Sequence, residues 1–226
     1  MIQLKNLSKS YGNKEVLKDI NLEFARGQVY GIVGANGAGK TTLFKCVAGL
    51  EDHYGKVESD QSPLKNHLGF LSTDPYFFSK ITGREYLQLL CNARGIQGKN
   101  FLTTNIFNLP LEEYAANYST GMKKKLALSA ILLLENDYYI LDEPFNGVDI
   151  QSNMIITEII HRLKTLNKVV LISSHIFSTL NKTCDRIYLL KDGEIDRTVD
   201  KNDFDALEQE MIDFTIGDSI NQLGLS

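Results

Sequence analysis

The sequence has few cysteines, no strong excess of one charge and no long hydrophobic run. Its three cysteines, Cys46, Cys91 and Cys184, lie far apart and show neither the CxxC spacing of metal sites nor an even disulfide framework. They favour a reduced, cytosolic compartment. A net charge of -4 supplies no general basic field, which argues against a nucleic-acid partner and requires that any bound anion be held locally.

Signals for crossing a membrane are missing as well. The first residues, MIQLKNLSKSYG, lack the apolar core of a signal peptide. The longest hydrophobic run, Leu126 to Leu134, is too short to cross a bilayer. We therefore expect the chain by itself to be soluble. With 226 residues and 43% hydrophobic content it can still bury a large core, as one domain or one domain with an insertion.

Hydrophobic periodicity predicts an α/β core. The N-terminal residues begin with short alternating runs, so we expect an antiparallel, partly exposed sheet there. Three nearly continuous apolar runs, at 29–33, 138–141 and 169–172, are typical of strands buried on both faces of a parallel sheet. Helical segments follow the first run and precede the other two, which completes the α/β pattern.

The remaining segments predict an insertion, a hairpin and a tail. Between about Tyr76 and Leu134 the pattern indicates helix without strands. Asp192-Gly193 predicts a hairpin turn. Phe204 to Phe214 predict an amphipathic helix with interspersed acidic residues, and we expect it to pack on the domain with those residues in solvent. Within one domain we expect a core at 1–75 and 135–200, a helical subdomain at 76–134 and a C-terminal tail at 201–226.

Residues 34–41, GANGAGKT, form a phosphate-loop motif. They follow a predicted strand and open a predicted helix, which is the context that GxxxxGK[ST] requires. Glycines are needed because backbone N–H groups must wrap a triphosphate closely, and the helix dipole adds positive potential. Lys40 supplies charge to the β and γ phosphates, and the Thr41 hydroxyl is placed to ligate Mg²⁺. The expected nucleotide-binding residues are Asn36, Gly37, Ala38, Gly39, Lys40, Thr41 and Thr42.

Two adjacent carboxylates, Asp142 and Glu143, end the predicted strand at 138–141. Such a pair is costly unless cations or hydrogen bonds stabilise it. Because successive strand residues point to opposite sides, we expect two different roles: Asp142 holds the Mg²⁺ shell, usually through water, and Glu143 polarises the attacking water. Many P-loop proteins share these two motifs, so kinases, GTPases and helicases all stay open at this point.

The segment YSTGMKKKL, at 118–126, narrows the choice. It resembles the signature of ATP-binding cassette (ABC) proteins, commonly LSGGQ, and it precedes the two carboxylates as it does in that family. Three further motifs of the family have counterparts here in the same order. Tyr11 resembles the aromatic residue that stacks on adenine, NGVD at 146–149 resembles the D-loop, and His175 resembles the switch histidine.

The resemblance implies a fold and a set of partners. It implies a P-loop NTPase (RecA-like) core with a mainly parallel sheet, an N-terminal antiparallel β subdomain and an inserted α-helical signature subdomain. Two cassettes, identical or different, then pair head to tail, so that Ser119 and Gly121 of one bind the ATP of the other. Tyr11 and Val16 join the nucleotide-binding residues, and His175 contacts the γ-phosphate. Integral membrane permease subunits are expected on separate chains, with the cassette peripheral at the inner face of the cell membrane.

The stretch GFLSTDP, at 69–75, resembles the Q-loop, with Thr73 where the family has glutamine. Thr73 keeps a hydroxyl but is shorter by about two heavy atoms, so metal contact requires a bridging water. The Asp74 carboxylate either compensates for the missing glutamine or bonds nearby backbone in the turn before Pro75. We favour the role in the turn. The aromatic residues at 76–78 are candidates for a groove that receives a membrane subunit.

The lysines at 123–125 are too few for a nucleic-acid patch. Because Met122, Leu126 and Leu133 mark an apolar face of the same helix, we expect the three lysines to face solvent.

We therefore expect a Mg²⁺-dependent ATPase subunit of an ABC transporter, resembling bacterial exporters of the drug and bacteriocin-immunity types. Two alternatives are a non-transport ABC ATPase that acts on DNA or ribosomes and a regulatory cassette without useful turnover. The first usually needs long coiled-coil arms between Lys40 and Asp142, or two cassettes, and neither feature is present. Glu143 argues against the second, because degenerate sites often lose that residue.

Overall fold

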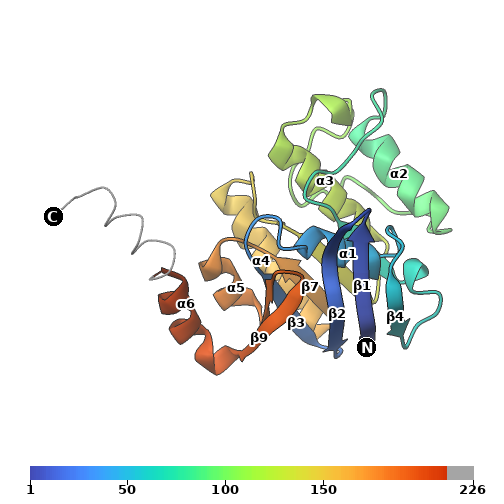
Figure 1. The fold of residues 1–226 in the computed structure, drawn as a ribbon. Coiled ribbons are helices and arrows are strands. Elements are labelled where there is room, and N and C mark those ends of the chain that lie inside the picture. The colour runs from blue at the N-terminus through green and yellow to red at the C-terminus, as the bar shows by residue number, and fades with distance from the viewer. Residues whose placement is uncertain (213–226) are drawn as a thin grey trace.

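Two β-sheets and the helices around them make up residues 1–212, the part of the chain that the structure, a computed structural model, describes (Figure 1). The strands are β1 (Ile2–Tyr11), β2 (Lys14–Phe24), β3 (Gln28–Val33), β4 (Tyr54–Ser59), β5 (Leu68–Leu71), β6 (Tyr138–Asp142), β7 (Val169–Ser173), β8 (Arg186–Lys191) and β9 (Glu194–Asp200). The α-helices are α1 (Lys40–Val47), α2 (Gly83–Ala93), α3 (Thr120–Leu133), α4 (Ile150–Thr165), α5 (Phe177–Thr183) and α6 (Phe204–Ile212).

The larger sheet has the order β5-β6-β7-β3-β8-β9. Its strands are parallel except for β9, which pairs with β8 in an antiparallel hairpin. Asp192 and Gly193 form the turn with φ of 48° and 85°, as the Asp-Gly pair predicts. The predicted continuous apolar runs are strands β3, β6 and β7, and the α/β prediction is confirmed.

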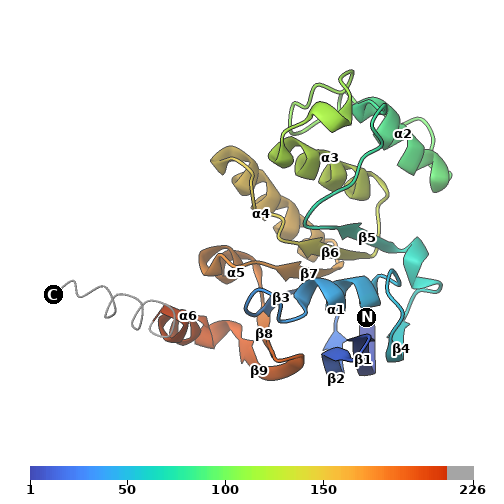
Figure 2. The same ribbon diagram turned by 45° about the horizontal axis from the view of Figure 1, so that its top comes forward.

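Each face of the larger sheet packs on a different layer (Figure 2). On one face, side chains such as Ile32, Ile140 and Leu171 form a core with α1 and the small antiparallel sheet β2-β1-β4. Val33 and Leu141 lie in the opposite core, which includes buried residues of α3, α4 and α5. The predicted N-terminal antiparallel sheet is therefore present, and α1 lies between the two sheets.

The insertion contains less helix than predicted. Only α2, α3 and the short 3₁₀ turn Ala115–Asn117 are helical between residues 76 and 134. Gly95 and Gly98 adopt positive φ after α2, and the Asn105 side chain bonds the backbone N–H and C=O of Leu109, so the chain turns instead of continuing a helix. Apolar anchors hold this loop to the core: Phe101, Phe107, Leu109 and Leu111.

The C-terminal helix begins where the sequence predicts. Phe204 and Leu207 of α6 are buried against the main core, and the predicted helix end at Phe214 lies outside the described residues. Within residues 1–212 no helix is both long and apolar enough to span a membrane. The division into a core, a 76–134 subdomain and a 201–226 tail stays a prediction.

Candidate functional site

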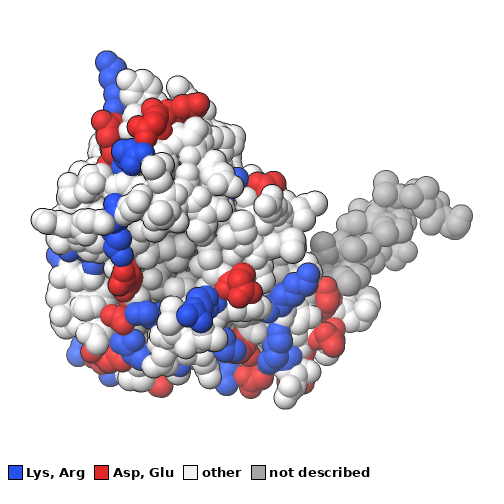
Figure 3. All heavy atoms as spheres, turned by 180° about the vertical axis from the view of Figure 1, so that it is seen from behind, with Lys and Arg blue, Asp and Glu red and all other residues white. Residues whose placement is uncertain are grey.

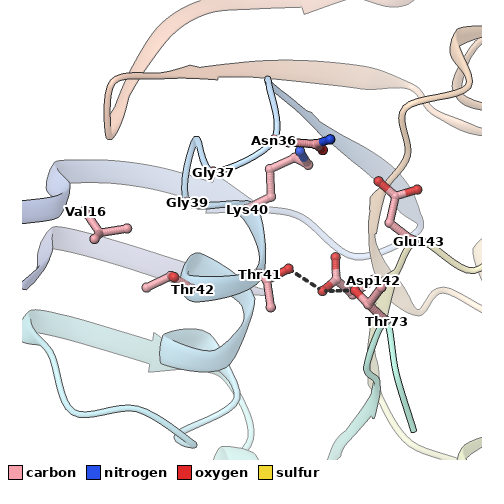
Figure 4. A pocket seen from close by; sticks show the side chains of 10 residues that line it. All are labelled: Val16, Asn36, Gly37, Gly39, Lys40, Thr41, Thr42, Thr73, Asp142 and Glu143. Carbon is pink, nitrogen blue, oxygen red and sulfur yellow. Dashed lines mark hydrogen bonds between the residues drawn. The ribbon is translucent and has the colours of Figure 1, made fainter. Parts of the chain in front are cut away.

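The carboxyl ends of four neighbouring parallel strands meet at one edge of the larger sheet. The loop at 34–39 follows β3, Thr73 follows β5, Glu143 follows β6 and His175 follows β7. Ligands bind at such edges because loops from adjacent strands converge there. A cavity of about 330 Å³ opens at this edge (Figure 4), and ten residues line it: Val16, Asn36, Gly37, Gly39, Lys40, Thr41, Thr42, Thr73, Asp142 and Glu143.

The predicted phosphate loop has the backbone that its glycines allow. Gly39 has φ of 108°, and a Cβ there would approach the Val16 carbonyl oxygen to 3.1 Å. The loop leads directly into α1, which begins at Lys40. The Lys40 ammonium donates to the carbonyl oxygens of Gly34 at 2.7 Å and Ala35 at 3.2 Å, so its charge stays at the loop. Loop amides, a helix N-terminus and an ammonium together suit a polyphosphate.

Asp142 joins three hydroxyl groups at the buried floor of the cavity. Its side chain is buried, and Oδ2 accepts hydrogen bonds from Thr41 Oγ1 at 2.7 Å and Thr73 Oγ1 at 2.8 Å (Figure 4). Oδ1 accepts from the Ser173 hydroxyl, a contact that the sequence did not point to. This all-oxygen set of hydroxyls and one carboxylate has the chemistry that Mg²⁺ prefers. Thr73, despite its unusual identity, therefore bonds the carboxylate that is predicted to hold the metal, and its own metal contact stays a prediction.

Glu143 lies beside Asp142 but points elsewhere (Figure 4). Its φ of 51° is in the left-handed region, and its backbone N–H donates to Ser173 Oγ at 2.9 Å. One carboxylate oxygen lies 2.8 Å from His175 Nδ1, while the imidazole is largely exposed. The sequence thus brings Glu143 and His175 together, although His175 does not line the cavity.

Tyr11 does not line the cavity, but its hydroxyl interacts with a residue that does. Its ring is partly exposed, the Lys9 ammonium lies 4.7 Å from the ring centroid, and its hydroxyl interacts with Glu51 and Thr42. Partial desolvation raises the pKa of this phenol above its usual value. Thr42, which interacts with Tyr11, lines the cavity, and the contact of Tyr11 with adenine stays a prediction. Ala38 faces a neighbouring hollow with Lys14, Lys18 and Gly193.

The predicted signature segment does not line the cavity of its own chain. Ser119 caps α3, and its hydroxyl accepts from the Met122 N–H at 3.3 Å. Gly121 is buried, and a Cβ at this position would lie 2.4 Å from the Gly147 carbonyl oxygen. The glycine is therefore required for contact between α3 and the loop at 146–149.

The prediction that all three lysines at 123–125 face solvent is wrong. Lys124 is 1% exposed, and its ammonium donates to the carbonyl oxygens of Glu143 at 2.7 Å and Asn146 at 3.1 Å. Lys125 is mostly buried beside Asp149. Gly121 and Lys124 share one helix face because they lie three residues apart. This spacing is the sequence signal that could have indicated that Lys124 faces the protein.

The aromatic residues at 76–78 divide into two kinds. Tyr76 and Phe78 are exposed, and their rings contact each other with centroids 5.8 Å apart. Phe77 is buried against Tyr86 with a centroid distance of 4.6 Å, so its expected place in a docking groove is wrong. Asp74 is exposed, and whether its carboxylate serves the turn stays a prediction.

A family model described as "ABC transporter" matches residues 17–146, more than half of the chain. The chain belongs to the ABC transporter family. The resemblance read from the signature, phosphate loop and carboxylate pair is confirmed, and this ABC cassette is an ATP-binding ATPase.

Relatives of this ABC cassette include named transport proteins. The bacitracin transport ATP-binding protein BcrA of Enterococcus faecalis is 30% identical, and the alignment covers 96% of this chain and 75% of the relative. The lantibiotic transport ATP-binding protein SrtF of Streptococcus pyogenes is 29% identical over 86% of this chain and 89% of the relative.

Solved structures agree with the fold of the cassette. A structure described as the ATP binding subunit of an ABC transporter matches with a TM-score of 0.80 and 27% identity, over 89% of this chain and 90% of the other. The dimeric cassette MJ0796 bound to ADP and Pi also has a TM-score of 0.80, over 89% of this chain and 99% of the other. At 20% identity that second likeness shows the fold alone.

Proposed function

We propose that this cassette hydrolyses MgATP in the described cavity and so drives export by separate membrane subunits. The observation that carries the proposal is the meeting of Thr41 and Thr73 on the buried Asp142 carboxylate, directly beside the Lys40 phosphate loop. A buried carboxylate that faces a polyphosphate loop is repelled by the ligand unless a cation lies between them. The side chains at this position fit Mg²⁺ as that cation.

Different residues of the cavity bind different parts of MgATP. The backbone of 36–39 and the Lys40 ammonium hold the phosphates, while Val16 and Thr42 line the side of the cavity away from Asp142 and Glu143 (Figure 4). Thr41 and Asp142 would hold Mg²⁺, with the Thr73 hydroxyl on the same Asp142 oxygen as that of Thr41. When bound, Mg²⁺ neutralises charge on the β and γ phosphates.

Glu143 is the group that we propose to act on water. Its carboxylate lines the cavity and points away from the Asp142 cluster, so it is free to accept a proton from the attacking water while Asp142 stays with the metal. His175, 2.8 Å from the Glu143 carboxylate, orients it and reaches toward the γ-phosphate. The Ser173 hydroxyl, which bonds both residues of the carboxylate pair, fixes their relative position.

A second cassette and a membrane protein complete the proposal. Ser119 and Gly121 lie outside the cavity of their own chain, which supports a head-to-tail pair in which each signature closes over the ATP of the partner. The names of BcrA and SrtF, which describe transport of bacitracin and lantibiotics, support an exporter. Lysines, arginines and carboxylates are interspersed on the described part of the face in Figure 3, which supports a role other than nucleic-acid binding. We place the cassette at the inner face of the cell membrane.

Replacement of Glu143 by glutamine tests this function. The change keeps the shape of the side chain but removes the basic oxygen, so kcat for ATP should fall at least about 100-fold while nucleotide affinity stays within about threefold. Phosphate release and equilibrium binding of a fluorescent ATP analogue measure the two quantities. Glu158→Gln, on the outer helix α4, is the matched control and keeps full turnover. Unchanged phosphate release by Glu143→Gln would remove Glu143 from this role.

A further inference from the structure

Lys124 carries a charge buried next to the proposed base. Its side chain is 1% exposed, and burial lowers the pKa of the ammonium below its usual value, although the nearby charges of Asp74, Glu143 and Asp142 oppose this shift. A buried ammonium is costly and persists only where acceptors and opposite charges surround it. The reaction proposed above does not use this ammonium directly.

The ammonium holds both ends of one turn. Glu143 O and Asn146 O accept its hydrogen bonds at 2.7 Å and 3.1 Å, and Glu143 O also accepts from the Asn146 N–H at 3.2 Å. Residues 143–146 therefore form a short turn that a single side chain of α3 closes from outside.

The same turn contains an unfavourable backbone conformation. Glu143 is a non-glycine residue with φ of 51°, a region that side chains other than Asn and Asp seldom adopt. Ser173 holds its N–H and Lys124 holds its carbonyl oxygen, so the peptide groups on both sides of this Cα are fixed. The direction of the Glu143 side chain follows from the position of these two groups.

We propose that Lys124 is a positioning residue that fixes the backbone of Glu143 and thereby aims its carboxylate at the attacking water. This inference rests on the proposed role of Glu143. It also connects the signature helix to the base within one chain: Gly121 and Lys124, on one face of α3, contact the 143–147 segment. A shift of α3 is thus transmitted to the base.

Lys124→Met in the full-length chain is the test. Methionine keeps the length of the unbranched stem and removes the donors. Displacing the base should lower kcat about 100-fold, while KM for ATP and the binding of ATP stay within about threefold. Lys124→Gln, which keeps an N–H donor, should recover at least about tenfold of the loss. A Lys124→Met variant that keeps kcat within about threefold of the parent would overturn the proposal.

Lys168→Met separates positioning from stability. Lys168 is partly buried and pairs with Asp137 just before β6, at the sheet edge opposite the cavity. Its loss should lower the melting temperature and leave kcat unchanged. A loss of kcat equal to that of Lys124→Met would show that the Lys124 effect is general destabilisation and overturn the proposal.

A double variant separates this inference from the proposed function. Because Lys124 acts through Glu143, Lys124→Met should not reduce the residual rate of Glu143→Gln further. Additive losses would overturn the positioning role and leave the Glu143 assignment intact. Full turnover by Glu143→Gln alone would instead remove the proposed base, and the role of Lys124 with it.

Discussion

Thr73 is the residue whose identity departs most from the family pattern, yet its side chain bonds the carboxylate that is predicted to hold the metal. Its hydroxyl and that of Thr41 bond the same Asp142 oxygen. We predict that Thr73→Gln raises basal ATPase or the apparent Mg²⁺ affinity by about tenfold, because the longer side chain replaces a bridging water. A Mg²⁺ titration of phosphate release measures both. Thr73→Ser should behave like the parent; no change with glutamine would make Thr73 a neutral substitution.

The cysteines provide a second prediction at this scale. All three are free and buried, and desolvation raises the pKa of Cys46 to about 11 and that of Cys184 to about 12. Since the thiolate is the reactive form, we expect native protein at pH 8 to react with Ellman's reagent slowly and unfolded protein to react at all three sites. Rapid reaction of a Cys184-only variant in the native state would contradict this burial.

At the scale of elements, Gly121 joins α3 to the loop at 146–149. An added methyl group would lie 2.4 Å from Gly147 O, so Gly121→Ala must separate the helix from this loop. We predict a loss of about 1–3 kcal/mol in the free energy of unfolding, measured in urea, together with reduced turnover. Thr120→Ala, at the exposed start of the helix, should cost less than about 0.5 kcal/mol and serves as the control. Equal stability of the two variants would contradict the contact.

Local patterns predict those elements whose packing is regular. The buried parallel strands, the hairpin at 192–193 and the helix after the phosphate loop follow from apolar runs and turn residues. The apolar residues at 94–119 predict helix from sequence alone, but in the structure they are anchors that hold a loop on the core. The sequence predicts an exposed Lys124 because amphipathic periodicity assumes one polar face, but α3 is covered on several sides, and residues 126–131 are all buried.

The site was predictable as a set of motifs but not as a set of contacts. Strand ends and glycine spacing placed Lys40, Thr41, Asp142 and Glu143 together, since adjacent parallel strands end at one edge. The roles of Ser173 and Lys124 depend on which side chains fill the space between elements, and sequence spacing does not contain that information.

At the scale of the whole molecule, a charged cluster ties the chain terminus to both sheets. Asp60 pairs with Arg26 and the N-terminal ammonium, and it bonds Tyr138. Chiefly through the Arg26 hydrogen bond, this cluster holds the pKa of Asp60 well below its usual value of 3.8. A carboxylate with a lowered pKa stabilises the fold above the unfolded-state pKa and loses that contribution as the pH falls further.

Asp60→Asn therefore has a pH-dependent effect. The variant should be less stable than the parent at pH 7, and the difference should shrink below about pH 4, where the parent begins to protonate Asp60 in the unfolded state. Urea unfolding at pH 7 and at pH 3 measures the difference. A penalty that is equal at both values would contradict the ion-pair account.

The central claim is that each chain supplies half of a composite site, with the phosphate loop on one side and the signature on the other. Light scattering of Glu143→Gln tests it most directly. We predict twice the monomer mass with MgATP, the monomer mass with ADP, and no ATP-dependent dimer once Ser119→Arg is added, although each chain still binds ATP. A Glu143→Gln chain that is saturated with ATP and stays monomeric would contradict the claim.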